Sequence, residues 1–181
     1  MQHKILLAKG LLEQTEREGI DKLTQYLDEI GFFTSPASTK YHGSVEGGLL
    51  IHSLEVSRIY SDLNQELKLK LEESSVSIVS LLHDICKAGC YLDNGNKTYK
   101  WNDRAPKGHG RLSIERVEKF IKLTEFERLA IRFHMGPWYS IQVMGTDKGE
   151  YTILELIDTW KKYPAVRFLY FADEAATQLG T

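Results

Sequence analysis

The sequence has few cysteines, no long hydrophobic run and almost no net charge. Cys86 and Cys90 are the two cysteines among 181 residues, and their spacing matches neither a zinc ribbon nor a thioredoxin motif. We therefore expect buried free thiols and a reducing, cytoplasmic setting. No stretch approaches the ~18 apolar residues of a membrane span, and no signal-peptide core is evident. With 23 basic and 25 acidic residues, no global field attracts nucleic acid or membrane.

Helical periodicity dominates what is present, whereas repeats and convincing strands are missing. The polar stretch 91–110 predicts a short hairpin or a lid, and Thr124 opens a capping box. We predict an all-α bundle of about eight helices, in which residues 1–35 form a helical extension packed on a main domain of residues 36–181. The expected helices are 5–15, 20–30, 49–67, 74–87, 111–122, 124–135, 151–160 and 163–179.

The most informative residues are a histidine and an aspartate within the most apolar expected helix. His83 and Asp84 follow a run of buried-type residues, where an unpaired carboxylate is expensive. A metal ion offsets that cost because both side chains become ligands. The alternative is an ion pair of Asp84 with Lys87 beside a hydrogen-bonded histidine, and for this dipeptide alone that alternative is the more common arrangement.

Further polar residues stand in similar surroundings. His52 and Asp173 each interrupt an apolar helical stretch, His109 lies between two glycines before a helix, and His134 ends another helix. Each is weak evidence alone, since a buried histidine is more often hydrogen-bonded in a core than bound to a metal. Their order along the chain is stronger evidence for one shared site.

The ordered pattern H…HD…H…H…D resembles the HD-domain metal-dependent phosphohydrolases. Flanking residues match as well, in the segments 47–53 (GGLLIHS), 83–87 (HDICK), 108–110 (GHG), 133–136 (FHMG) and 172–175 (ADEA). The likeness covers about residues 40–178. It is closest to uncharacterised bacterial and phage-borne HD hydrolases, and more distant to the HD domain of a bacterial 3′–5′ exoribonuclease. It implies an HD-type helical bundle with one or two divalent ions, drawn from Mn, Mg, Fe, Co, Ni and Zn.

The resemblance implies a role for each residue of the pattern. His109 and His134 would bind a second metal ion or act on the phosphate, and Lys87 would bind a phosphate oxygen. On a helix, Lys87 also projects from the same face as His83, four residues earlier. Asp84, Lys87, His109 and His134 are thus the expected catalytic residues. The expected ligands of the first metal ion are His52, His83, Asp84 and Asp173.

Several alternatives stay open at this point. Binuclear relatives often have two adjacent histidines where this chain has His134 and Met135, and a thioether is a poor ligand for hard cations. A single ion is therefore nearly as well supported as two. Asp158 competes with Asp173 as the last ligand, although we expect Asp158 to face solvent. His42 could also reach the site, but a loop histidine is usually solvated.

The stretch 91–111 combines basic and aromatic side chains, which suits a nucleotide or short single-stranded nucleic acid; a solvated loop is the alternative. We predict hydrolysis of a phosphomonoester or phosphodiester of a nucleotide or short oligonucleotide by metal-activated water, with no membrane partner. A non-catalytic nucleotide or metal sensor and a di-iron oxygenase are the competing functions. The expected substrate-binding residues are Lys87, Trp101, Arg104 and Lys107.

Overall fold

The computed structural model describes residues 1–40, 42–96, 98–106 and 108–179. Lys107, an expected substrate contact, and Lys97 from the same basic stretch lie outside the described residues, so the role of Lys107 stays a prediction. In the part of the chain that is described, no helix combines the length and the apolar character needed to cross a membrane.

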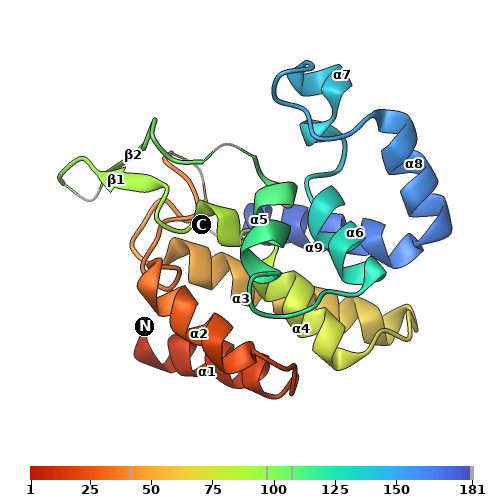
Figure 1. Ribbon diagram of the computed structural model, residues 1–181, viewed down its shortest axis with the longest axis horizontal. Coiled ribbons are helices and arrows are strands. Elements are labelled where there is room, and N and C mark those ends of the chain that lie inside the picture. Colours follow the sequence, from red (N-terminus) through yellow and green to blue (C-terminus); the bar gives the residue numbers. More distant parts are fainter. Residues whose placement is uncertain (41, 97, 107, 180–181) are drawn as a thin grey trace.

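Helices make up most of the described residues, which confirms the all-α class (Figure 1). The α-helices are α1 (Gln2–Glu13), α2 (Ile20–Glu29), α3 (Gly48–Glu66), α4 (Glu73–Leu82), α5 (Gly110–Val117), α6 (Glu125–Phe133), α7 (Ile141–Met144), α8 (Ile153–Lys162) and α9 (Pro164–Leu179). Two short 3₁₀ helices are η1 (Ile85–Lys87) and η2 (Gly136–Tyr139). Strands β1 (Tyr91–Asp93) and β2 (Tyr99–Trp101) pair antiparallel. The polar stretch 91–110 therefore contains a short hairpin.

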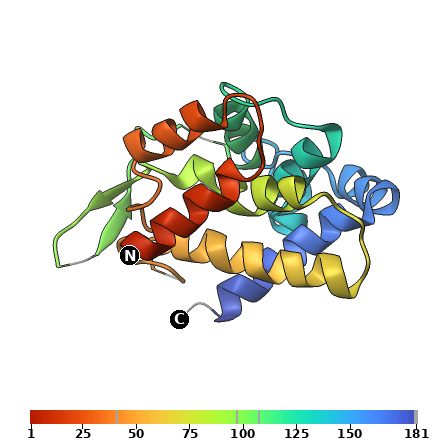
Figure 2. The ribbon, with the colours of Figure 1, turned by 90° about the horizontal axis from the view of Figure 1, so that it is seen from below.

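Helix α3 is the centre of the packing. It lies against α1, α4 and α9, while α6 packs on α4, α5 and α9 (Figures 1 and 2). Tyr60 of α3 is fully buried, and its hydroxyl donates to the carbonyl of Ala165 at the start of α9 over 2.9 Å. Leu12 of α1 and Leu23 of α2 belong to the same buried cluster. The N-terminal helices thus share the core, and a boundary at residue 35 stays a prediction.

The helix expected over 74–87 is interrupted, and this was the main error in the predicted helices. Helix α4 ends at Leu82, Asp84 has φ −106° and ψ 14°, and η1 follows. The ring Nδ1 of His83 lies 2.8 Å from the carbonyl oxygen of Ser80, the acceptor that a continuing helix would offer to the backbone N–H of Asp84. The helical argument that placed Lys87 on the face of His83 is therefore wrong, because the chain turns between them.

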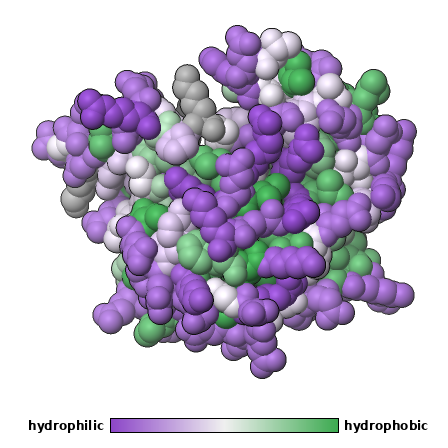
Figure 3. All heavy atoms as spheres, viewed as in Figure 1, coloured by the Kyte–Doolittle hydropathy of each residue, from purple (hydrophilic) through white to green (hydrophobic). Residues whose placement is uncertain are grey.

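Polar side chains cover most of the face seen in Figure 3, with apolar side chains visible between them near its centre.

The capping box predicted at Thr124 is present. The hydroxyl of Thr124 accepts from the backbone N–H of Glu127, and the carboxylate of Glu127 accepts from the backbone N–H of Thr124. This cap begins α6, and the helix then delivers His134 to the interior at its other end.

Candidate metal centre

Six side chains that the sequence pattern singled out meet in the middle of the bundle. They come from five places along the chain, and their ligand atoms form three overlapping groups in which all atoms lie within 4.8 Å of one another. The most exposed of the six, Asp173, has only 13% of its side chain exposed. The six residues are His52 on α3, His83 and Asp84 after α4, His109 before α5, His134 after α6 and Asp173 on α9.

The expected ligands of a first metal ion lie together. Asp173 Oδ1 is 2.9 Å from His52 Nε2 and 3.8 Å from His83 Nε2. Asp84 Oδ2 is 3.6 Å from His83 Nε2 and 3.9 Å from His52 Nε2. Donors that bind one ion at about 2.1 Å lie roughly 3 to 4 Å apart. His52, His83 and Asp84 form one group that fits a shared cation, and Asp173 joins His83 and His134 in an overlapping group.

The other oxygen of Asp84 faces the remaining two histidines. Asp84 Oδ1 lies 3.2 Å from His109 Nε2 and 3.5 Å from His134 Nε2. Asp84 therefore turns one oxygen toward each half of the cluster, which is the arrangement of a carboxylate that can bridge two ions. The donors fit either one ion or two, so the choice between them stays open.

Several of these atoms are buried without a hydrogen-bond partner among the described residues, namely His83 Nε2, His134 Nε2 and Asp84 Oδ1. Buried polar atoms are nearly always paired, and an unpaired one costs about 1–3 kcal/mol. Convergence of such atoms on one another, with lone pairs facing inward, is the arrangement that a divalent cation satisfies.

Two of the histidines are oriented in the same way. His83 Nδ1 lies 2.8 Å from the carbonyl of Ser80, and His134 Nδ1 lies 2.6 Å from the carbonyl of Ile131, in each case three residues earlier at a helix end. A carbonyl can only accept, so Nδ1 carries the proton and Nε2 keeps its lone pair for a metal ion. Local backbone geometry thus fixes both rings in the ligating tautomer.

His109 is held differently. Its Nδ1 lies 2.9 Å from the thiol sulfur of Cys86, and a thiol can donate or accept. This contact fixes the ring's direction but leaves its tautomer free. His109 can therefore either bind a second ion through Nε2 or donate a hydrogen bond from it, the two roles that the sequence left open.

The charge state of the cluster suits metal binding. Burial lowers the pKa of His83 to about 4 and that of His109 to about 3, although Asp84 opposes both shifts. Burial alone would raise the pKa of Asp84, but Lys87 and His83 outweigh it and hold that pKa well below its ordinary value. Neutral imidazoles and an ionised carboxylate are the ligand forms that a cation requires.

His134 departs from this pattern. Burial would lower its pKa, but the carboxylate of Asp84 outweighs burial and raises it. Metal binding at this imidazole must therefore displace a more tightly held proton than at His83 or His109.

Lys87 Nζ lies 2.6 Å from Asp84 Oδ2, with 19% of the lysine side chain exposed. The ion pair weighed as an alternative therefore exists, and it exists beside the cluster rather than in place of it.

Glu150 supports His109 from a distant loop. Its carboxylate accepts from the backbone N–H groups of His109 and, over 3.0 Å, of Arg111, so it caps the beginning of α5. The residue is only 7% exposed. Nothing in the sequence indicated this role, because the contact joins residues about 40 positions apart and Glu150 lies outside any motif.

We expect Glu150→Ala to weaken metal binding by about 10- to 100-fold, the usual cost of losing a group that orients a ligand. Glu155→Ala is the matched control, since Glu155 caps the beginning of α8 in a capping box with Thr152 and holds none of the six ligand candidates. Both variants should lose about 1 kcal/mol of stability. Calorimetric titration with Mn²⁺ measures the affinities; equal affinities in the two variants would show that Glu150 is only a helix cap.

The structure also shows where Asp158, His42 and Tyr139 lie relative to the cluster. The side chain of Asp158 is 76% exposed and faces Lys161, as expected for a solvent-facing residue. The ring of His42 lies 5.0 Å from that of His52, and both its nitrogens are buried without a partner among the described residues. The expectation of a solvated His42 was therefore wrong. Tyr139 packs its ring 5.1 Å from His109 and forms part of the same wall.

The hairpin residues lie outside the cluster. The ring of Trp101 is 40% exposed and packs edge-on against Tyr91 at 5.5 Å, while Arg104 is exposed. No contact between described residues joins Trp101 or Arg104 to the six ligand candidates. Their role in substrate binding stays a prediction, as does that of Lys87 in phosphate binding.

A family model described as the HD domain matches residues 49–174, a span that includes all six side chains of the cluster. No curated protein and no solved structure matches. Because the matched span is well over half of the chain and carries the complete H…HD…H…H…D series, the chain belongs to the HD domain family.

Proposed function

We propose that the protein is a metal-dependent phosphohydrolase that cleaves a phosphomonoester or phosphodiester, with a nucleotide or short oligonucleotide as the substrate. One observation carries this proposal: the buried cluster of four imidazoles and two carboxylates, whose unpaired ligand atoms converge beside a lysine. Membership of the HD domain family supports hydrolase chemistry in general.

Different residues of the site would bind the metal ion, bind the phosphate and donate a proton during hydrolysis. A bound divalent ion supplies Lewis acidity and a water whose pKa is lowered toward ~7. The ligand side chains hold and orient the site, and Lys87 stands beside Asp84, where its ammonium can pair with a non-bridging phosphate oxygen. His134 is the better proton donor of the two remaining histidines, because its pKa is raised whereas that of His109 is lowered.

The nucleotide part of the proposal depends on the hairpin. Tyr91 begins β1 and is close enough to the centre for Lys87 and Asp84 to act on its hydroxyl, whose pKa burial raises to about 12. Trp101 packs on Tyr91 and is exposed, and Arg104, three residues later, is exposed as well. An exposed aromatic ring and a cation in one loop are the groups that bind a base and its phosphate.

Protein loaded with Mn²⁺ or Ni²⁺ should release p-nitrophenol from bis(p-nitrophenyl) phosphate and phosphate or nucleoside from members of a nucleotide panel, and a chelator should abolish the release. Tight nucleotide binding without turnover would favour the sensor function instead. Stoichiometric iron with oxygen uptake would favour an oxygenase. Metal content measured on protein purified without chelator accompanies each assay.

A further inference from the structure

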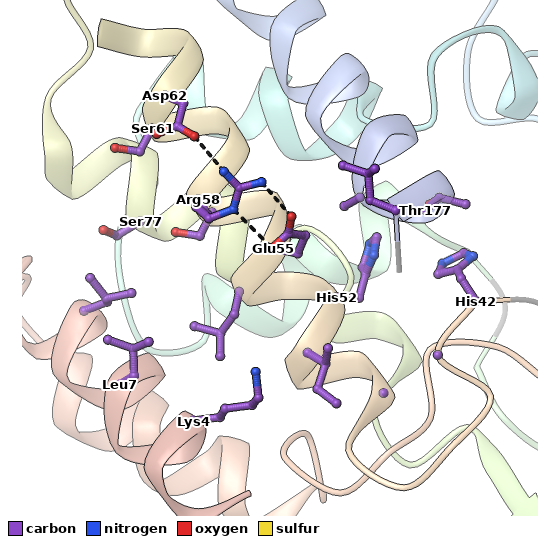
Figure 4. Close-up of a pocket in the computed structure, with 18 of the residues that line it drawn as sticks. Lys4, Leu7, His42, His52, Glu55, Arg58, Ser61, Asp62, Ser77 and Thr177 are labelled. Atoms are coloured by element: carbon purple, nitrogen blue, oxygen red, sulfur yellow. Dashed lines mark hydrogen bonds and ion pairs between the residues drawn. The ribbon is translucent and has the colours of Figure 1, made fainter. Parts of the chain in front are cut away.

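A groove runs from the metal centre along the outer side of α3, between α1 and the end of α9 (Figure 4). Its volume is about 1210 Å³, large enough for a sizeable organic ligand. Figure 4 shows His42 and His52 at one end and the side chain of Arg58 farther along α3, with Lys4 and Leu7 on the opposite wall.

The groove reaches the metal centre at His52, the one of the six ligand candidates that lines it among the described residues. Gly48, His52 and Glu55 all line it and share one face of α3, since they are spaced by four and three residues. On α9, Ala176 and Thr177 line it and follow Asp173 by three and four residues. The same helix faces that carry two ligand candidates therefore continue into the groove walls.

Exposed apolar side chains gather in this groove. Leu7 is 47% exposed, Val45 53%, Ile51 37% and Leu179 65%, and they come from four separate segments. A single exposed apolar residue is ordinary, but several lining one hollow mark a binding surface. The surface therefore suits an apolar group.

The charges along the groove do not suit a polyanion. Arg58 is already paired, with Glu55 at 2.7 Å and Asp62 at 2.8 Å. The hydrogen bond from Arg58 lowers the pKa of the Glu55 carboxyl group, and the nearby ammonium of Lys4 lowers it further. Glu73 adds a third carboxylate to the lining. A chain of further phosphates would meet at least as many carboxylates as cations.

His42 stands where the groove meets the centre. Both its ring nitrogens are buried and lack a partner among the described residues, and its ring lies 5.0 Å from that of the ligand candidate His52. A group bound in the groove and joined to a phosphate at the metal site would pass this ring, which then gains the hydrogen-bond partner that it lacks.

We propose that this groove binds the organic part of the substrate, an elongated, uncharged and largely apolar group that carries a single phosphate, and that His42 contacts the substrate next to that phosphate. The inference rests on the phosphohydrolase part of the proposed function and differs from its nucleotide part, because the groove favours an apolar ester of one phosphate over a nucleotide or oligonucleotide. The continuity of the groove with the metal centre argues for substrate rather than a second copy of the chain.

The test compares ethyl phosphate with hexyl phosphate as substrates of the Mn²⁺-loaded protein, by release of inorganic phosphate. The hexyl ester should have a kcat/KM at least about tenfold higher, since each buried methylene contributes about 0.8 kcal/mol and 1.4 kcal/mol is tenfold. Leu7→Glu should raise KM for the hexyl ester and bring the ratio of the two kcat/KM values, hexyl over ethyl, close to one. His42→Ala should raise KM for both esters.

Leu154→Glu is the matched control, because Leu154 is 71% exposed on α8 and does not line the groove; it should change neither ester. Turnover of both esters without a chain-length preference, or an equal loss on both in Leu7→Glu, overturns the groove proposal and leaves the phosphohydrolase function standing. Absence of turnover with both alkyl esters in protein that cleaves bis(p-nitrophenyl) phosphate overturns the groove proposal alone, and absence of turnover with that substrate and the nucleotide panel as well overturns both. A dimer that Leu7→Glu converts to monomer would assign the groove to a second copy and overturn the proposal too.

Discussion

Asp84→Asn should abolish metal-dependent hydrolysis and metal retention together. Asp84 is 1% exposed, and its two oxygens face different histidine pairs, so the neutral amide weakens every candidate set that includes this residue. Loss of the ion removes several kcal/mol of transition-state stabilisation, and about 4 kcal/mol corresponds to roughly a thousandfold lower rate. Hydrolysis of bis(p-nitrophenyl) phosphate and elemental analysis of the same sample measure the two losses.

Asp158→Asn is the control for that experiment. It makes the same chemical change on an exposed face of α8, where Asp158 only approaches Lys161 at 3.8 Å. We expect unchanged rate and metal content, because surface ion pairs of this kind contribute about 0–1 kcal/mol. Full metal occupancy and a near-normal rate in Asp84→Asn would refute the proposed centre.

Gly48→Ala should lower the free energy of unfolding by about 3 kcal/mol. A Cβ at position 48 would overlap the backbone carbonyl of Gly43, and backbone cannot move aside as a flexible side chain can. That carbonyl accepts from the N–H of Ala37 over 2.8 Å and closes the loop that carries His42. The close approach of this loop to the beginning of α3 thus explains Gly48, whereas Gly47 before it has a positive φ of 73°.

Gly10→Ala should change the free energy of unfolding in the opposite direction. Gly10 lies inside α1, and an added Cβ would meet nothing within 4 Å. Alanine there should raise the free energy of unfolding by about 0.5–1 kcal/mol, the difference in helix propensity. Urea denaturation of both variants measures the changes, and a Gly48→Ala protein as stable as the parent would contradict the assigned role of the glycine.

The sequence predicted the long helices because their apolar periodicity records which face is buried. The spans expected around α3, α8 and α9 agree with the structure to within two residues at each end. The break after Leu82 could not be predicted in this way, since a ring nitrogen of His83 competes for a backbone carbonyl and the apolar pattern continues past it. Helix α7 (Ile141–Met144) is too short to have a period.

The candidate site also contains residues that the sequence predicted and residues that it could not predict. Order and flanking residues identified the ligand candidates, and the preference for Asp173 over Asp158 agrees with where the two side chains lie. Glu150 depended on a contact between segments distant in sequence, which a single sequence does not reveal. His42 was named as a residue that could reach the site, but its burial beside His52 depended on the packing of its loop. Their importance appeared only with the helix cap and the unpaired ring nitrogens.

Helices α4 and α6 both end at the centre, each delivering a histidine from its last turn. The carboxyl end of a helix carries a partial negative charge of about half an elementary charge, so the backbone adds to the negative potential of the two carboxylates. Lys87 offsets only part of that potential. An anionic phosphate would be repelled from the empty site and attracted once a divalent ion is bound, so substrate should enter after the metal, in an ordered sequence.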